Sequence, residues 1–175
     1  SRNLPALRVV GQLRETYIVA EGPDGMYLLD QHAAHECILY ERLRGAAERG
    51  SPEIQGLLEP ALVELTHEQA GIIANHEDLL VRYGWGLESF GERSCLVRAA
   101  PAVLNMRGPA QALTDLLDNL LTDEPFVSWE ERMAATVACH GSVRAGMPMA
   151  TAEMIEMVRL LEKLRQPHTC PHGRP

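Results

Sequence analysis

The first 30 residues alternate between short apolar runs and turn-forming residues. Apolar residues dominate positions 8–13, 17–21 and 26–29. A Gly-Pro-Asp-Gly segment at 22–25, which is typical of a tight turn, separates the second run from the third. Because these gaps are too short to hold crossover helices, the pattern predicts three antiparallel strands.

After residue 30 the apolar positions recur with helical spacing. They predict a helix from about Gln31 to the Gly-Ser-Pro segment at 50–52. Thr66 and Gln69 are spaced as a capping box and predict a helix that continues to about Leu80. Further helices are expected over 109–121, 129–145 and 151–164, and further strands over 57–65, 84–90 and 95–99. We therefore expect an α+β fold of small antiparallel sheets packed with helices.

The middle of the chain has strand and helix content of its own and predicts an inserted lobe, external and regulatory, over 53–127. Residues 1–52 and 128–175 would then form a dimerisation lobe that carries the candidate metal site. The N-terminal sheet has aliphatic residues on both faces, such as Val9 and Val10, so both faces need cover. One helix layer and a second subunit would supply that cover.

Composition narrows the classes of function. The 175 residues carry 16 Lys and Arg against 24 Asp and Glu, a formal charge of −8, which argues against a free-standing, sequence-independent DNA-binding protein. No apolar run approaches the ~18–20 residues of a membrane-spanning helix, so no membrane partner is expected. Four scattered cysteines are too few for a small disulfide scaffold, and with seven histidines they favour metal binding over disulfide bonding.

A histidine and several acids stand together after residue 30. His32 and Glu36 are four residues apart, so on a helix they lie on one face and can bind one metal ion. By itself this spacing is more commonly that of an ordinary helix-surface hydrogen bond. Asp30 stands at the helix start, where its carboxylate can cap the helix, ligate a metal or orient His32. Glu41 falls about 180° around the helix from His32, which favours a supporting role.

Cysteines supply the second group of candidate ligands. Cys170 and His172, two residues apart in a Pro- and Gly-containing loop, are typical of a short metal knuckle that needs ligands from elsewhere. Cys139 lies inside a predicted helix, where a lone cysteine is more commonly a small core residue. Thiolate, imidazole and carboxylate ligands together favour zinc, and additional oxygen ligands would suit manganese.

A third segment, Gln-Gly-Leu-Leu-Glu-Pro at 55–60, has the form of a short docking peptide. The same residues are also compatible with the entry into an ordinary strand, and the segment alone favours that alternative.

Together these motifs resemble the C-terminal domain of the MutL family of mismatch repair proteins, in its endonuclease-bearing form. The family signature Asp-Gln-His-Ala, two residues, Glu, four residues, Glu matches the segment 30–41. Its Cys-Pro-His-Gly-Arg-Pro element matches 170–175, and an Ala-Cys element matches 138–139. The chain departs from the family at His140 and Cys37, where the family often has Arg. The resemblance covers essentially the whole chain.

The resemblance implies a specific site. Asp30 would be essential to cleavage, with His32 and Glu36 beside it as catalytic residues. The ligands of one or two zinc or manganese ions would be His32, Glu36, Cys139, Cys170 and His172. Supporting roles would fall to Gln31, Glu41, His140 and Arg174.

The resemblance also implies partners. Such domains form homodimers and nick one strand of duplex DNA near a mismatch, directed by the sliding clamp of replication. The clamp would dock on Gln55, Leu58 and Pro60. The other partners would be an upstream ATPase domain of the same protein and a mismatch-recognition protein. The protein would act in the bacterial cytoplasm, at the nucleoid. Because of its negative charge, this part alone would bind DNA weakly. The alternative is a non-catalytic dimerisation and clamp-binding module with a structural zinc.

Overall fold

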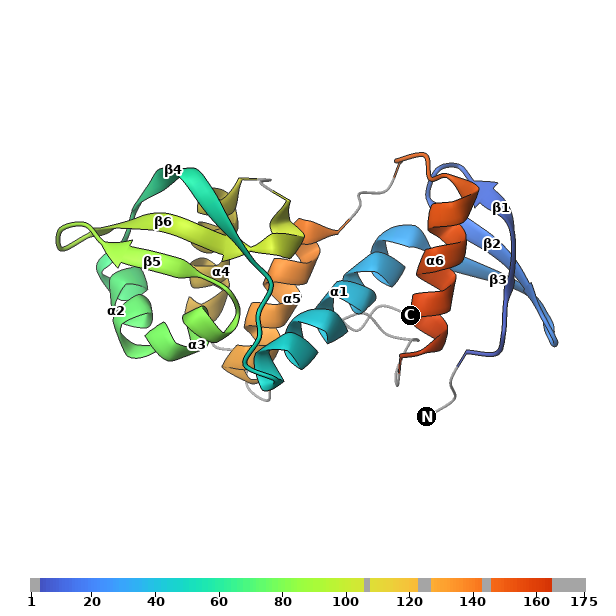
Figure 1. Cartoon of the computed structure of the whole chain (residues 1–175), viewed down its shortest axis with the longest axis horizontal. Coiled ribbons are helices and arrows are strands. Elements are labelled where there is room, and N and C mark those ends of the chain that lie inside the picture. The colour runs from blue at the N-terminus through green and yellow to red at the C-terminus, as the bar shows by residue number, and fades with distance from the viewer. Residues whose placement is uncertain (1–3, 106–107, 123–126, 143–145, 165–175) are drawn as a thin grey trace. The chain divides into compact units, whose positions relative to one another are not determined.

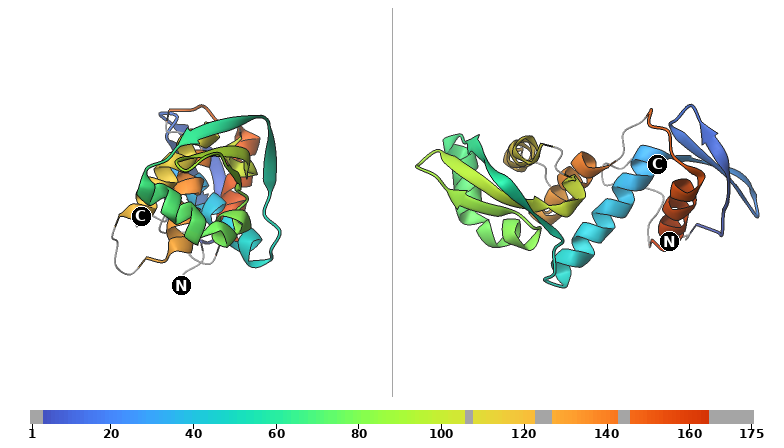
Figure 2. Two further views of the ribbon diagram at one scale, coloured as in Figure 1. Left: turned by 90° about the vertical axis from the view of Figure 1, so that its left-hand side faces the viewer. Right: turned by 45° about the horizontal axis from the view of Figure 1, so that its top comes forward.

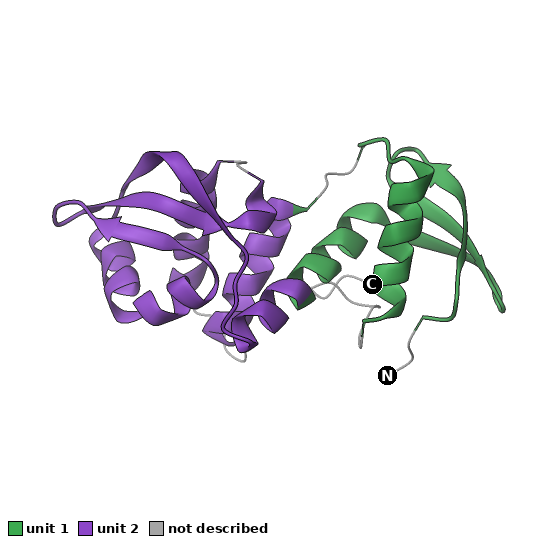
Figure 3. Cartoon of the chain, viewed as in Figure 1, with its two compact units in different colours: residues 1–41, 142–175 green, residues 42–141 purple. Residues whose placement is uncertain are grey.

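A computed structural model describes residues 4–105, 108–122, 127–142 and 146–164. The chain divides into two compact units (Figure 3). Residues 1–41 and 142–175 form the first unit, and residues 42–141 form the second.

The first unit contains a three-stranded antiparallel sheet in the order β1-β2-β3 (Figure 1). The strands are β1 (Arg8–Leu13), β2 (Tyr17–Gly22) and β3 (Gly25–Asp30), as the apolar runs predict. The register of β2 with β3 runs without interruption from Tyr17 opposite Asp30 to Gly22 opposite Gly25. Gly25 has a φ of 131°, which a side chain would strain, so glycine allows the tight turn here.

Two helices cover one face of this sheet. Helix α1 (Gln31–Glu48) follows β3 directly, and α6 (Thr151–Glu162) lies against the strands (Figure 2). Ile18, fully buried on β2, packs with one face of α1 and one face of α6. The core of the unit consists of Leu4, Ile18, Ala34, Cys37, Ile38, Met154, Met157, Val158 and Leu161.

The opposite face of the sheet is apolar but exposed. We call this surface the outer face of β1–β3. It carries large hydrophobic side chains that are between 40% and 72% exposed: Val10, Leu13, Tyr17, Met26 and Leu28. Since side chains alternate along a strand, Tyr17, Met26 and Leu28 point away from the core that holds Ile18. On β1, Leu13 pairs with Tyr17 and shares its face, and the irregular register between Val9 and Gly11 interrupts the alternation at the exposed Val10.

The second unit contains another three-stranded antiparallel sheet, in the order β4-β6-β5. Its strands are β4 (Ile54–Glu64), β5 (Gly86–Ser89) and β6 (Ser94–Pro101). Its helices are α2 (His67–Asn75), α3 (Glu77–Arg82), the short 3₁₀ helix η1 (Ala102–Leu104), α4 (Pro109–Leu121) and α5 (Trp129–Gly141). The core is aliphatic, with Leu113, Leu116 and Leu117 of α4 fully buried.

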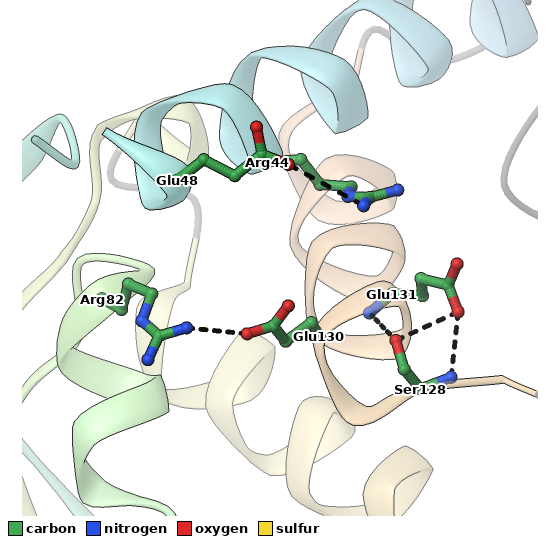
Figure 4. A network of polar contacts seen from close by, with 6 residues as sticks. All are labelled: Arg44, Glu48, Arg82, Ser128, Glu130 and Glu131. Carbon is green, nitrogen blue, oxygen red and sulfur yellow. Dashed lines mark hydrogen bonds and ion pairs between the residues drawn. The ribbon is translucent and has the colours of Figure 1, made fainter. Parts of the chain in front are cut away.

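Polar contacts fix the helices of this unit to one another. Arg132 of α5 donates to the backbone carbonyls of Asn119 and Thr122, so a buried guanidinium caps the C-terminus of α4. Arg82 of α3 pairs with Glu130 of α5 at 2.8 Å (Figure 4). Each contact joins α5 to another helix of the same unit.

The predicted α+β class is confirmed, with six α-helices and two small antiparallel sheets in the described residues. The capping box of Thr66 and Gln69 is also confirmed. The single helix expected to reach Leu80 is wrong, because His76 closes α2 and α3 begins at Glu77. Helix α5 ends at Gly141, earlier than predicted. The inserted lobe over 53–127 stays a prediction. No described helix is long and apolar enough to cross a membrane.

Candidate functional site

Asp30 stands at the junction of β3 and α1. Its Oδ1 accepts hydrogen bonds from the backbone N–H groups of His32 at 2.9 Å and Ala33 at 3.1 Å. The carboxylate therefore caps α1, where the positive end of the helix dipole also favours it. This contact places the Asp30 carboxylate beside His32 at the start of the helix.

His32 and Glu36 lie one turn apart on α1, as their spacing predicts. Glu36 is only 3% exposed, and His32 is half-buried. Burial of a carboxylate is costly unless protein hydrogen bonds or a cation compensate it, and a divalent ion is one such cation. Glu41 lies further along the same helix and is exposed.

A serine that the sequence patterns do not single out contacts His32. The Oγ of Ser142 lies 3.1 Å from Nδ1 of His32, and Ser142 is only 2% exposed. The two residues are 110 positions apart, and no spacing rule relates them.

Gln31 is fully buried in the first unit. Its Oε1 accepts from Nε2 of Gln12 at 2.6 Å, and its own Nε2 donates to the carbonyl of Met147 at 3.0 Å. Gln12 donates to the same carbonyl and accepts from the N–H of Met149 at 3.2 Å. The predicted supporting role of Gln31 stays a prediction, and its observed contacts hold the segment 146–149 against β1 and α1. Gln12, like Ser142, belongs to none of the motifs found in the sequence.

In the second unit, Cys139 lies on α5 and is exposed, so the alternative of a buried core cysteine is wrong. Its neighbour His140 pairs through Nε2 with Oδ2 of Asp115 on α4 at 3.0 Å. The other two described cysteines, Cys37 and Cys95, are buried. Burial raises the pKa of the Cys95 thiol, which keeps it neutral and a poor ligand. Cys139 is thus the accessible thiol among the described residues.

The described residues contain no group of three or more His, Cys, Asp or Glu side chains arranged to hold a metal ion. Cys170, His172 and Arg174 lie outside the described residues. The donor atoms of the described candidate residues therefore decide whether these residues suit a metal ion. A carboxylate and an imidazole on one turn of α1 and an accessible thiol on α5 are ligands that zinc accepts.

The candidate docking segment runs from a paired part of β4 into a bulge of the same strand. Gly56 pairs with Ala99 and Ala61 with Val97, so residues 57–60 stand opposite Arg98 alone. Leu58 is fully exposed, and Gln55 and Pro60 are exposed as well. Because β4 is an edge strand, a bulge and a proline are tolerated there. The segment does enter a strand, as the alternative predicts, but the strand is not an ordinary one because of the bulge.

A hollow of about 420 Å³ lies between α2, α3 and the β5–β6 hairpin. Ala70, Val81, Trp85 and Leu87 contribute to its lining. None of the described candidate residues lines this hollow, so it is separate from them.

Comparison with known sequences decides the family. The family profile described as the MutL C terminal dimerisation domain matches residues 10–149. The chain belongs to this family. As a MutL C-terminal dimerisation domain it is 37% identical, over 98% of its length, to the DNA mismatch repair protein MutL of Koribacter versatilis. It is 42% identical to the MutL of Rhizorhabdus wittichii and 41% identical to that of Caulobacter vibrioides, each over 94% of the chain.

The chain spans about a quarter of the length of these MutL relatives, 27%, 28% and 26% in turn. The family description names dimerisation, and the relatives are named as DNA mismatch repair proteins.

Proposed function

We propose that this MutL domain is a metal-dependent endonuclease that nicks one strand of duplex DNA. The observation that carries the proposal is the start of α1, where Asp30 caps the helix beside His32 and the buried Glu36 follows one turn later. All three residues belong to the first unit.

The proposed ligands are His32, Glu36, Cys139, Cys170 and His172. A bound zinc or manganese ion would neutralise phosphate charge and lower the pKa of a bound water. Asp30 would orient the attacking water or ligate a second, exchangeable ion. Cys139 is included because its exposed thiol can be reached by an ion from solvent.

A substitution at Asp30 tests the proposed catalytic role without disturbing the fold. Asparagine is as good an N-cap as aspartate, so Asp30→Asn keeps the bonds to the N–H groups of His32 and Ala33 and removes only the charge. We expect nicking of supercoiled plasmid in manganese to fall by about 100-fold or more. The melting temperature should stay close to that of the wild type.

Asp24→Asn is the matched control, because Asp24 lies exposed in the turn between β2 and β3 of the same sheet. It should nick like the wild type. Equal rates for the wild type and Asp30→Asn would refute the role of Asp30. If no protein nicks even with the clamp supplied, the non-catalytic alternative with a structural zinc is favoured.

We propose the outer face of β1–β3 as the homodimer interface. Its five large hydrophobic side chains, exposed in the single chain, form a patch of the kind that marks association sites. A second copy of the same face would cover it in a two-fold arrangement.

The sliding clamp is the proposed partner of the β4 bulge. The fully exposed Leu58 is an apolar anchor, with Gln55 and Pro60 on either side. We expect Leu58→Ala to weaken clamp binding about tenfold in a calorimetric titration. Leu62→Ala is the control, because Leu62 is 54% exposed on the same strand but lies in its paired part. Equal losses for both variants would contradict docking at the bulge.

Weak binding of this domain to bare duplex DNA follows from its charge of −8. The ATPase part of the protein, a mismatch-recognition protein and the clamp would deliver it to DNA.

A further inference from the structure

The contact between Ser142 and His32 constrains the chemistry of the imidazole ring. Nδ1 of His32 faces the serine oxygen at 3.1 Å, and the serine is 2% exposed. Buried hydroxyl groups make their hydrogen bonds within the protein, so Nδ1 of His32 is a structural partner of Ser142.

Two arrangements of protons satisfy this contact. Either Nδ1 carries the proton and donates it to Oγ, or Oγ–H donates to Nδ1 and the ring proton lies on Nε2. Only the first arrangement leaves the lone pair on Nε2, the nitrogen that points away from Ser142. Ligating histidines almost always donate their other N–H to a fixed protein group, which sets the tautomer and the ring orientation.

We propose that Ser142 is a positioning residue, which accepts a hydrogen bond from Nδ1–H of His32 and so presents Nε2 of that ring to a divalent cation. The inference rests on the proposed function, since the cation is that of the proposed nuclease site. It adds a residue that the family signature at 30–41 does not contain.

The surrounding contacts support a fixed position for this pair. His32 lies in the first turn of α1, which is capped by Asp30. Four residues after Ser142, the segment 146–149 is held by Gln12 and Gln31 and by a bond from the N–H of Gly146 to the carbonyl of Glu15 at 2.9 Å. Both sides of the contact thus belong to anchored parts of the first unit.

The test uses the 175-residue chain and three variants. Ser142→Ala removes the acceptor without adding volume, and Ser142→Thr retains a hydroxyl. Ser51→Ala is the control, because Ser51 is exposed and follows α1 in the second unit. Circular dichroism establishes that each variant folds.

The first readout is the tautomer of His32 in the metal-free chain, from long-range ¹⁵N–¹H correlation spectra at neutral pH. We expect the Nδ1–H form in the wild type and in Ser142→Thr, and a shift toward the Nε2–H form in Ser142→Ala. A wild-type ring in the Nε2–H form, or a ratio that Ser142→Ala leaves unchanged, would overturn the proposal.

The second readout is the affinity for zinc alone, measured by competition with a chromogenic chelator. Ser142→Ala should bind about tenfold more weakly, and Ser142→Thr and Ser51→Ala should match the wild type. A wild-type chain that binds no zinc would refute the proposed metal site, and the tautomer would then decide the Ser142–His32 contact by itself. Zinc binding that Ser142→Ala leaves within about twofold would refute the positioning role.

Discussion

The two sheets of the chain have similar inner faces and different outer faces. Ile18 and Ala20 of β2 are fully buried on the inner side of the first sheet, and Val97 of β6 is fully buried on the inner side of the second. The outer face of β1–β3 carries five large, exposed hydrophobic side chains. The outer face of the β4-β6-β5 sheet carries the exposed Leu62 together with an ion pair between Glu88 and Arg98.

Isolated exposed hydrophobic residues are normal, whereas a contiguous group of them marks a binding surface. Leu62 on β4 is 54% exposed and pairs with Leu96, which pairs in turn with Glu88 of the surface ion pair, whereas Leu28 on β3 is 55% exposed among other exposed hydrophobic residues. Similar exposure of one residue type therefore has different meanings on the two sheets. The proposed interface therefore lies on the first sheet and not on the second.

The largest effect is expected from a charge on the outer face of β1–β3. Leu28→Glu would bury a carboxylate in the proposed interface and weaken the homodimer by about 100-fold or more. Analytical ultracentrifugation over a range of concentrations measures this change.

The matched control places the same substitution on the other sheet. Leu62→Glu should leave the dimer intact, because Leu62 has the same exposure outside the proposed interface. A monomeric Leu62→Glu, or a fully dimeric Leu28→Glu, would reverse the assignment of the two faces.

A smaller effect is expected at the start of α5 in the second unit. Glu131 accepts from the backbone N–H of Ser128 at 2.9 Å and from its hydroxyl, at the start of α5 (Figure 4). These contacts hold the pKa of Glu131 below its usual range. The hydrogen bond from the backbone N–H of Ser128 lowers it most, followed by the bond from the Ser128 hydroxyl and, more weakly, by the positive charge of Arg44. Because the folded pKa is depressed, this stabilisation is present above the unfolded pKa and is lost as pH falls through the folded value.

We expect Glu131→Ala to reduce the free energy of unfolding by about 0.5 kcal/mol at neutral pH. The difference from the wild type should shrink as pH falls below about 4, near the unfolded pKa of a glutamate. Urea denaturation at several pH values measures it, with Glu156→Ala on an exposed position of α6 as the control. A difference that is independent of pH would contradict the charge-based contribution.

The smallest effect is expected on the outer face of the second sheet. Arg98 and Glu88 are both more than half exposed, and exposed ion pairs contribute little. Arg98→Ala should leave the free energy of unfolding, measured by urea denaturation, nearly unchanged and should leave the dimer unchanged. A larger loss would show that this face is also covered by a partner.

Much of the fold follows from local patterns. The capping box of Thr66 and Gln69 and the start of α4 at Pro109 depend on neighbours within a few residues, and the sequence predicts both. The break between α2 and α3 is also local, but polar residues around His76 do not interrupt the helical spacing strongly enough to predict it.

The parts of the site that depend on distant segments could not be predicted. The start of α1 follows from a motif of consecutive residues, with Asp30 as its cap. The contact of Ser142 with His32 joins positions 110 apart, and Gln12 reaches Met147 across 135 positions. The bulge at 57–60 appears only in the register of β4 with β6. Each of these depends on tertiary pairing, which spacing along the chain does not encode.

The bulge in β4 has a consequence for solubility. An edge strand with a continuous row of unpaired N–H and C=O groups can recruit strands from other chains and begin aggregation. Residues 57–60 interrupt that row in the middle of β4, and Pro60 lacks an N–H altogether. The same irregularity that displays Leu58 therefore prevents the edge from acting as a template for unrelated chains.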